Sequence, residues 1–244
     1  MKFNKEFNRD TAYWNDFYKK NPPASMQESR FARFVAKYVE KGRVLVDIGC
    51  GNGRDSFFFG RLGLSVVGID ASDEIISSLS RVASAGHSFV CGNFINEKTV
   101  YGNRADYFYS RFSLHAINED GQNELIKNVY GSLSEGGKFF IEVRCVRDSK
   151  YGKGEEVEPN AFILDGHYRR FIVMEDLLSE LIKAGFHIKY AEQEKGFAPF
   201  NGDDSEIIRI VAVKRGGIQT AWGGVQKYSK IHLFSCPHGV VRVA

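Results

Sequence analysis

Residues 43–55 read R-V-L-V-D-I-G-C-G-N-G-R-D, an apolar run that ends in an acid and is followed by a glycine-rich turn. The run Val44–Val46 is partly β-branched, which favours a strand buried on both faces of a parallel sheet. Gly49, Gly51 and Gly53 occupy alternate positions, where a missing Cβ lets backbone N–H groups approach a ligand closely. We therefore predict a strand, a ligand-binding turn and then a helix.

The spacing of the glycines separates two kinds of cofactor-binding turn. The dinucleotide fingerprint G-x-G-x-x-G would place its third glycine at position 54, where this chain has Arg54. The pattern G-x-G-x-G, with Asp47 two residues before its first glycine, resembles motif I of the class I S-adenosylmethionine-dependent methyltransferases. The resemblance extends from Tyr13 to Lys214 and is specific across residues 43–94. A glycine-rich turn without a ligand is the alternative.

A second apolar segment, Val66–Asp70, also ends in an acid. In a strand–helix–strand unit such an acid reaches a ribose, whose hydroxyls need an acceptor, so we expect Asp70 in that role. The resemblance implies that the Asn93 side chain accepts from the adenine amino group and that Phe94 lies against the ring. It also implies cofactor contacts at Trp14, Asp47, Gly49, Cys50, Gly51, Gly53, Asp55, Ala71 and Ser110.

The apolar segments and the resemblance together predict an α/β fold. We expect a doubly wound, mostly parallel seven-stranded sheet with helices on both faces and an antiparallel last strand. Helices are expected at 29–40, 54–62, 120–133 and 174–184, with Ser72 capping a further one, and glycines 136 and 137 ending the third; strands are expected at 44–46, 66–70, 88–94, 105–110, 138–145, 186–193 and 207–213.

The remaining segments define the predicted domain organisation. Residues 1–215 form the methyltransferase domain, in which the resemblance implies that residues 1–27 are an N-terminal lid. Residues 146–170 have no helical or alternating period, and we predict a loop that closes over the substrate. Residues 216–244 contain no Asp or Glu and receive no role.

Composition limits the classes of function. A chain of 244 residues is long enough for one large α/β domain, and its net charge of +3 does not argue for nucleic acid. No apolar run reaches transmembrane length and the N-terminus is charged, so we expect a cytoplasmic protein. The four cysteines have no disulfide or zinc spacing; we predict free thiols and no metal site. The oligomeric state is left open.

Basic residues follow the fourth and fifth strands and recur in the 146–170 loop. Arg111 and His115 are expected at the catalytic position, because ligands of open α/β sheets bind at the carboxyl ends of the strands. The predicted substrate residues are Arg111, His115, Arg144, Tyr151, His167, Tyr168 and Arg169. Arginine binds carboxylate or phosphate bidentately, which favours a small anionic substrate. The alternatives are arginines that are solvated or pair with Glu142, Glu155 and Glu156, and a structural His115 rather than a base.

Two short segments refine the resemblance. Y-S-R-F-S-L-H at 109–115 and H-Y-R-R-F at 167–171 resemble bacterial small-molecule methyltransferases, some of which modify phosphorylated or phosphoramidated surface glycans. This implies O-methylation of a small metabolite or glycan precursor that carries a phosphate, phosphoramidate or carboxylate. A nucleic-acid methyltransferase would usually have Asn-Pro-Pro-aromatic after the fourth strand, where this chain has Ser-Arg-Phe-Ser. A catalytically silent protein that binds the cofactor or a partner is the other alternative.

Overall fold

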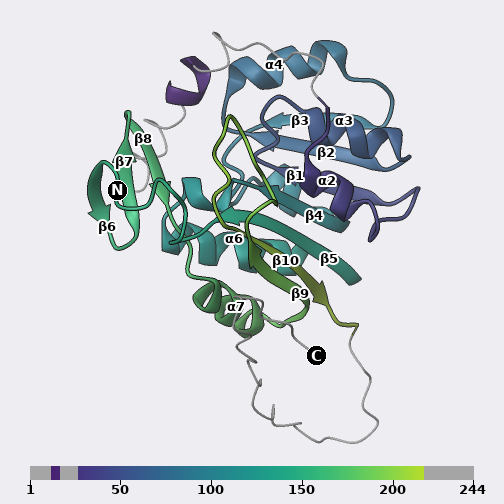
Figure 1. Cartoon of the computed structure of the whole chain (residues 1–244). Coiled ribbons are helices and arrows are strands. Elements are labelled where there is room, and N and C mark those ends of the chain that lie inside the picture. The colour runs from purple at the N-terminus through teal and green to yellow at the C-terminus, as the bar shows by residue number, and fades with distance from the viewer. Residues whose placement is uncertain (1–11, 17–26, 217–244) are drawn as a thin grey trace, which may run out of the picture.

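A seven-stranded sheet forms the centre of the computed structural model, which describes residues 12–16 and 27–216 (Figure 1). The strands follow the order β3-β2-β1-β4-β5-β10-β9, and all run parallel except β10, which pairs antiparallel with β5 and β9. This confirms the predicted fold class. The strand bounds are β1 (Val44–Ile48), β2 (Ser65–Asp70), β3 (His87–Cys91), β4 (Ala105–Arg111), β5 (Leu133–Arg144), β9 (Phe186–Glu194) and β10 (Ile207–Lys214).

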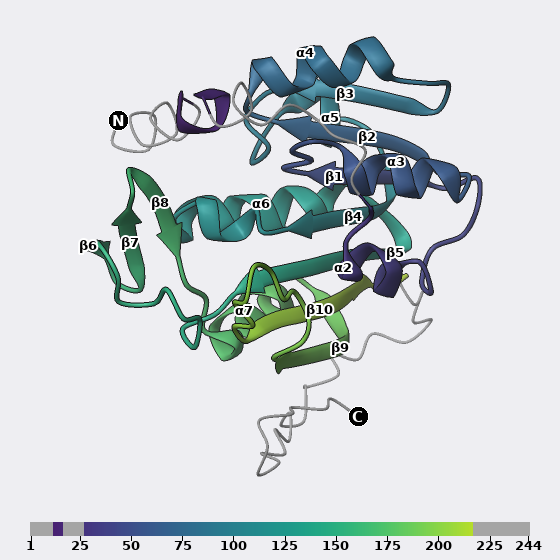
Figure 2. The ribbon, with the colours of Figure 1, turned by 45° about the horizontal axis from the view of Figure 1, so that its top comes forward.

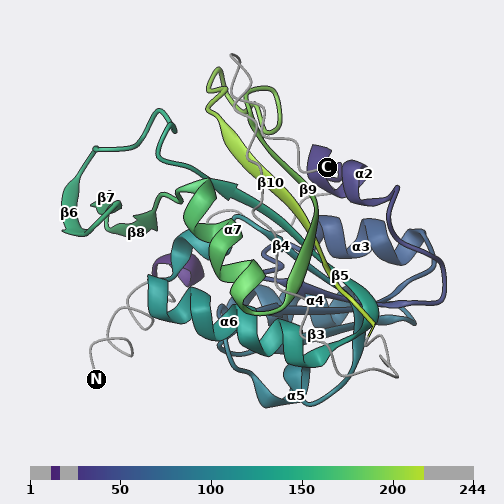
Figure 3. The same cartoon turned by 90° about the horizontal axis from the view of Figure 1, so that it is seen from below.

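Helices cover both faces of this sheet (Figure 3). On one face, α6 and α7 bury apolar residues such as Leu125 and Leu177 against β1, β4, β5 and β10. On the other face, α2 and α3 bury Phe31 and Phe59 against the same strands. Because the central strands are covered on both sides, they read as continuous apolar runs. The helical elements are α2 (Arg30–Val35), α3 (Arg54–Arg61), α4 (Asp73–Val82), α5 (Lys98–Tyr101), the 3₁₀ turn η1 (Leu114–Ala116), α6 (Glu119–Ser132) and α7 (Met174–Lys183).

Several helices and strands end at other residues than the sequence predicted. The predicted 29–40 helix ends at Val35, since the chain tightens into i→i−3 bonds from Lys37 and Tyr38. The α6 helix ends at Ser132 rather than at the two glycines, which lie within β5. The third strand ends at Cys91 rather than at position 94. The predicted Ser72 cap is confirmed, because its hydroxyl accepts the Ile75 N–H.

Residues 146–170 are not the structureless loop that the sequence predicted. They contain a three-stranded antiparallel sheet, β6 (Glu155–Glu158), β7 (Ala161–Leu164) and β8 (His167–Arg170), which stands beside α6 (Figure 2). The tight turns between its strands contain Asn160, Asp165 and Gly166, all of which have positive φ angles. Each strand has four residues, too few for an alternating pattern to be recognised. We call this unit the β6–β8 sheet.

Two composition-based expectations can be compared with the described residues. Among them, no helix combines the length and apolar character needed to cross a bilayer. Cys50, Cys91 and Cys145 are free thiols, and within the same ranges no group of three metal-ligating side chains occurs. The predictions for residues 1–11, 17–26 and 217–244, including most of the N-terminal lid and nearly all of the C-terminal tail, lie outside the described residues.

Candidate active site

The carboxyl ends of the parallel strands bring the main predicted residues to one edge of the sheet. β1 and β2 end near Asp47 and Asp70, whereas β4 and β5 end at Arg111 and Arg144. These four strands lie side by side in the sheet, in the order β2-β1-β4-β5. We call this region the carboxyl edge; it is where ligands of open α/β sheets bind.

The glycine turn between β1 and α3 needs its glycines for two reasons. Gly49, Gly51 and Gly53 have φ angles of 66°, 52° and 73°, in the left-handed region that disfavours L side chains. A Cβ on Gly49 would lie 2.5 Å from the Ser113 hydroxyl oxygen, and one on Gly53 would lie 2.7 Å from a Leu79 methyl carbon. The turn is therefore packed against both η1 and α4 without room for a side chain.

Asp70 is held by the backbone at the end of β2. Its carboxylate accepts the Gly51 N–H at 2.9 Å and the Ser72 N–H at 3.0 Å. Burial raises the pKa of Asp70, and these backbone donors counteract the shift. A carboxylate oxygen has two lone pairs, so each retains capacity for a further donor. The predicted contact with a ribose would use this remaining capacity.

Asp47 is the buried acid of the turn. Only 3% of it is exposed, and its carboxylate accepts the Ser56 hydroxyl at 2.6 Å. Burial raises the pKa of Asp47 to about 7, and the nearby negative charges of Asp55 and Asp70 add to the shift. The two predicted carboxylates therefore lie within electrostatic range of each other.

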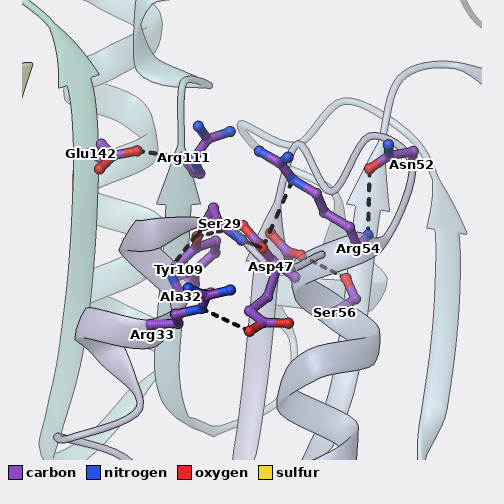
Figure 4. A network of polar contacts seen from close by, with 12 residues as sticks. Ser29, Ala32, Arg33, Asp47, Asn52, Arg54, Ser56, Tyr109, Arg111 and Glu142 are labelled. Carbon is purple, nitrogen blue, oxygen red and sulfur yellow. Dashed lines mark hydrogen bonds and ion pairs between the residues drawn. The ribbon is translucent and has the colours of Figure 1, made fainter. Parts of the chain in front are cut away.

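Asp55 belongs to a structural network that sequence reasoning did not find. Its carboxylate accepts the Ser29 N–H, the Ser29 hydroxyl and the Tyr109 hydroxyl, each at 2.7 Å. These bonds join the start of α2, the first turn of α3 and strand β4, at the position where Figure 4 places Ser29 beside Tyr109. We predicted Asp55 as a cofactor contact, but its hydrogen bonds serve the packing of α2. The partners lie 26 and 54 residues away, beyond any local pattern.

The other predicted cofactor contacts have varied surroundings. The Cys50 side chain packs with Ile75 and Leu79 of α4, and the Ser110 hydroxyl is buried with no hydrogen-bond partner among the residues that the structure describes. The Asn93 side-chain oxygen accepts the Ile95 N–H at 3.0 Å, so only its second lone pair remains for a ligand. Phe94 is buried, Ala71 is partly exposed, and Trp14 lies in the helical turn at residues 12–16.

Arg111 pairs with a buried glutamate. Its Nε donates to Glu142 at 2.9 Å, while Arg209 Nε donates to the other oxygen of Glu142 at 2.7 Å. Figure 4 shows the terminal nitrogens of Arg111 turned away from this carboxylate. Among the described residues, they have no acceptor. Arg111 therefore pairs with a glutamate, which was one of the two alternatives to a substrate contact. Its two terminal nitrogens remain available to a ligand.

A basic cluster lies at the end of β5 and on β8. It consists of His115 from η1, Arg144 from β5, and His167 and Arg169 from β8. Arg170 donates to the Ile117 carbonyl at 2.9 Å, which anchors β8 against the chain after η1. We name the four residues the basic cluster.

Three members of the basic cluster have buried nitrogens that find no hydrogen-bond partner among residues 12–16 and 27–216. These atoms are Nδ1 of His115, Nδ1 of His167 and Nε of Arg169. Burial and, to a smaller extent, the charges of the neighbouring arginines lower the pKa of His115 well below 6.5 and that of His167 to about 4. Buried polar atoms are nearly always paired in folded proteins, so three together indicate a place that receives a polar ligand or water.

The remaining predicted substrate residues have partners within the protein. The Tyr151 and Tyr168 hydroxyls donate to Asn160 and Glu158, respectively, at 2.8 and 3.1 Å. Arg144 Nη1 donates to Asp148 at 2.5 Å, which leaves its other nitrogens without a protein acceptor among the described residues. The tyrosines therefore contribute to the β6–β8 sheet, whereas Arg144 keeps donors for a ligand.

The helical turn at residues 12–16 connects the two halves of the carboxyl edge. Asn15 exchanges hydrogen bonds with Ser72 and Asp73 at the start of α4. Tyr13 stacks on His167 of β8 at 4.8 Å between ring centroids, and Trp14 meets the same ring edge-on at 5.1 Å. The turn thus links the Asp70 side of the edge with the basic cluster. Aromatic residues near the N-terminus were the available sequence signal.

Comparison with known proteins supports the same fold. The sequence model of the methyltransferase domain family matches residues 45–137. Among curated proteins, none is similar enough in sequence to count as a relative.

Several solved structures have a similar fold over most of the chain. A TehB-like S-adenosylmethionine-dependent methyltransferase from Corynebacterium glutamicum is 19% identical, with a TM-score of 0.60 over 84% of this chain and 98% of its own. The 1,6-didemethyltoxoflavin N1-methyltransferase of Burkholderia thailandensis, solved with its namesake compound and S-adenosylhomocysteine, is 17% identical, with a TM-score of 0.59 and 80% of each chain covered. The [4+2]-cyclase SpnF is 18% identical, with a TM-score of 0.65 over 85% and 94% of the chains.

The glycine turn, the acid that ends β2, the strand order and the family match therefore agree. Residues 45–137 thus match the methyltransferase domain family, and the chain has the fold of solved S-adenosylmethionine-dependent methyltransferases.

Proposed function

We propose that this methyltransferase transfers a methyl group to an oxygen of a small anionic molecule that carries a phosphate, phosphoramidate or carboxylate group. The observation that carries the proposal is the basic cluster, where buried nitrogens of His115, His167 and Arg169 have no partner in the described part of the chain. Arg144 adds donors beside them. An anion would satisfy these nitrogens and balance the positive charge of Arg169.

The cofactor is held on the other half of the carboxyl edge. Asp70 accepts the ribose hydroxyls, and the glycine turn gives the cofactor close access to the backbone. Asn93 and Phe94 lie beyond the end of β3, where they contact the adenine. S-adenosylmethionine supplies an electrophilic methyl carbon on a sulfonium centre.

The protein's contribution to the chemistry is mainly positioning. An acceptor oxygen that is already anionic at neutral pH attacks directly, so no proton has to be removed. Arg111, Arg144 and Arg169 hold the anion with one oxygen in line with the methyl carbon. His115 stays neutral in this positive environment, and we assign it a hydrogen bond to the acceptor rather than the role of a base.

The acceptor half of the proposal is tested by methyl transfer to a panel of small molecules. Purified protein with S-adenosylmethionine is incubated with phosphate monoesters, phosphoramidates and carboxylates, together with their neutral esters. We expect mass increases of one methyl group only for the anionic members. Methylation of the neutral esters at equal rates would contradict an anionic acceptor.

The cofactor half is tested separately by calorimetry with S-adenosylhomocysteine. Asp70→Asn should weaken binding about tenfold or more, because a carboxylate accepts ribose hydroxyls more strongly than an amide. Glu74→Gln is the matched control, since it removes one negative charge from the first turn of the adjacent α4. Equal affinities for the Asp70→Asn variant and the wild type would remove Asp70 from the cofactor site.

A further inference from the structure

Phe112 has a backbone conformation that is unusual for its residue type. It follows β4 directly and has a φ angle of 58°, in the left-handed region. The other non-glycine residues with positive φ in the described ranges are Asn160, Asp165 and Asn201, whose types tolerate this region. A bulky side chain is disfavoured there, and glycine would adopt the same backbone without strain.

The surrounding backbone enforces this conformation from both sides. The Phe112 N–H donates to the Glu142 carbonyl of β5 at 2.8 Å. The next residue, Ser113, donates its hydroxyl to the Ile48 carbonyl of β1 at 2.5 Å. Residues held in such regions at the end of a strand frequently belong to functional sites. Because glycine would adopt this backbone without strain, we looked for contacts of the phenyl ring that glycine could not make.

The ring contacts two of the proposed substrate arginines. The guanidinium carbon of Arg111 lies 4.4 Å from the ring centroid and that of Arg144 lies 5.1 Å from it. The His115 ring is 5.8 Å away. Both guanidinium distances are within the range for cation–π attraction. One half-buried ring thus lies beside two like charges that come from different strands.

Each of these arginines is also held by a carboxylate. Arg111 pairs with Glu142 through Nε and Arg144 pairs with Asp148 through Nη1. Between a carboxylate and the shared ring, each guanidinium has a fixed plane and keeps donor nitrogens without a protein acceptor in the described part of the chain. Two oriented guanidiniums on one support match the several oxygens of a phosphate group.

We propose that Phe112 is a positioning residue that holds Arg111 and Arg144 together as a two-guanidinium clamp for the anionic group of the acceptor. This inference rests on the proposed anionic acceptor. In this role Phe112 does not itself bond the anion but orients the two arginines that do. This accounts for a phenylalanine at a strained backbone position.

The test uses full-length protein saturated with S-adenosylhomocysteine, with inorganic phosphate as the probe. Phosphate affinity is measured by calorimetry or by ³¹P NMR titration. Phe112→Leu should weaken phosphate binding about fivefold or more, because it keeps an apolar side chain but loses the ring face. Phe112→Tyr should retain binding within about twofold of the wild type. S-adenosylhomocysteine affinity should stay unchanged in both variants.

Two controls separate the role of Phe112 from general effects. Phe58→Leu removes a half-buried ring of α3 that Arg61 approaches at 5.9 Å, and it should leave phosphate affinity unchanged. Phe112→Gly should melt about 2–4 °C above Phe112→Ala, since both lack the ring and only alanine keeps the backbone strain. The glycine variant should nevertheless bind phosphate as weakly as Phe112→Leu.

Two negative outcomes distinguish a failure of the clamp from a failure of the proposed function. Equal phosphate affinity in the wild type and Phe112→Leu overturns the clamp and leaves the proposed function in place. A wild-type protein that binds S-adenosylhomocysteine but no phosphate overturns the anionic acceptor and, with it, the clamp.

Discussion

At the scale of single residues, Asp47 links the glycine turn to the stability of the fold. Its pKa is about 7 in the folded protein, compared with 3.8 for an ordinary aspartate. The folded state therefore binds a proton more tightly than the unfolded state does. Stability from this group is fully present below about pH 4 and is lost as the pH rises to about 7. The difference corresponds to at most about 4 kcal/mol.

We predict that Asp47→Asn removes this loss of stability. Asparagine can still accept the Ser56 hydroxyl, but it carries no charge to be buried. The melting temperature of the variant should rise relative to that of the wild type between pH 5 and pH 8. Thermal melts at both pH values check the prediction. A constant difference across this range would mean that Asp47 does not titrate there.

Single residues also show which parts of the site could be predicted. The glycines and Asp70 were identified because a positive φ angle favours glycine and because an apolar run that ends in an acid can be recognised locally in the sequence. The partners of Arg111 could not be chosen in the same way, since Glu142 lies 31 residues away. Several glutamates were possible partners, and only the strand register selects one.

At the scale of elements, the β6–β8 sheet separates two adjacent arginines with different surroundings. The buried Nε of Arg169 has no partner where the structure describes the chain, whereas Arg170 donates to the Ile117 carbonyl and to Gln122. Adjacent residues of a strand point to opposite faces. The sequence pair Arg-Arg gives no indication of this division, because the three short strands had not been predicted.

We predict that the two arginines respond differently to the same substitution. Arg169→Gln should weaken phosphate binding about tenfold with little change in stability, because its Nε bonds to none of the described residues. Arg170→Gln should cost about 1–3 kcal/mol of stability, since it leaves the Ile117 carbonyl and Gln122 without their donor. Phosphate titration and thermal melts of both variants check this, and the reverse pattern would exchange their roles.

At the scale of the whole molecule, a mostly parallel sheet covered by helices was predictable, and the side-chain contacts between segments far apart in the sequence were not. Apolar runs that end in Asp47 and Asp70 indicated parallel strands with helices between them. Each of these signals lies within one strand–turn–helix unit. The contacts that join distant units, such as Arg209 with Glu142 across 67 residues, depend on the completed sheet.

Glu142 is the residue that joins these units. Only 1% of its side chain is exposed, and its oxygens bind Arg111 of β4 and Arg209 of β10 from its own position in β5. Arg209 in turn lies 5.4 Å from the Phe31 and Phe34 rings of α2. The ion network therefore extends from the carboxyl edge to the helix layer on the far side of the sheet.

We predict that Glu142→Gln lowers the free energy of unfolding by about 3–5 kcal/mol, because it leaves the buried Arg209 without its counter-charge. Urea unfolding of the wild type and the variant measures this loss. Glu180→Gln is the matched control, since it breaks an exposed ion pair with Lys183 and should cost at most about 0.5 kcal/mol. Similar losses in the two variants would show that Arg209 finds other compensation and that the Glu142 network does not hold the strands together.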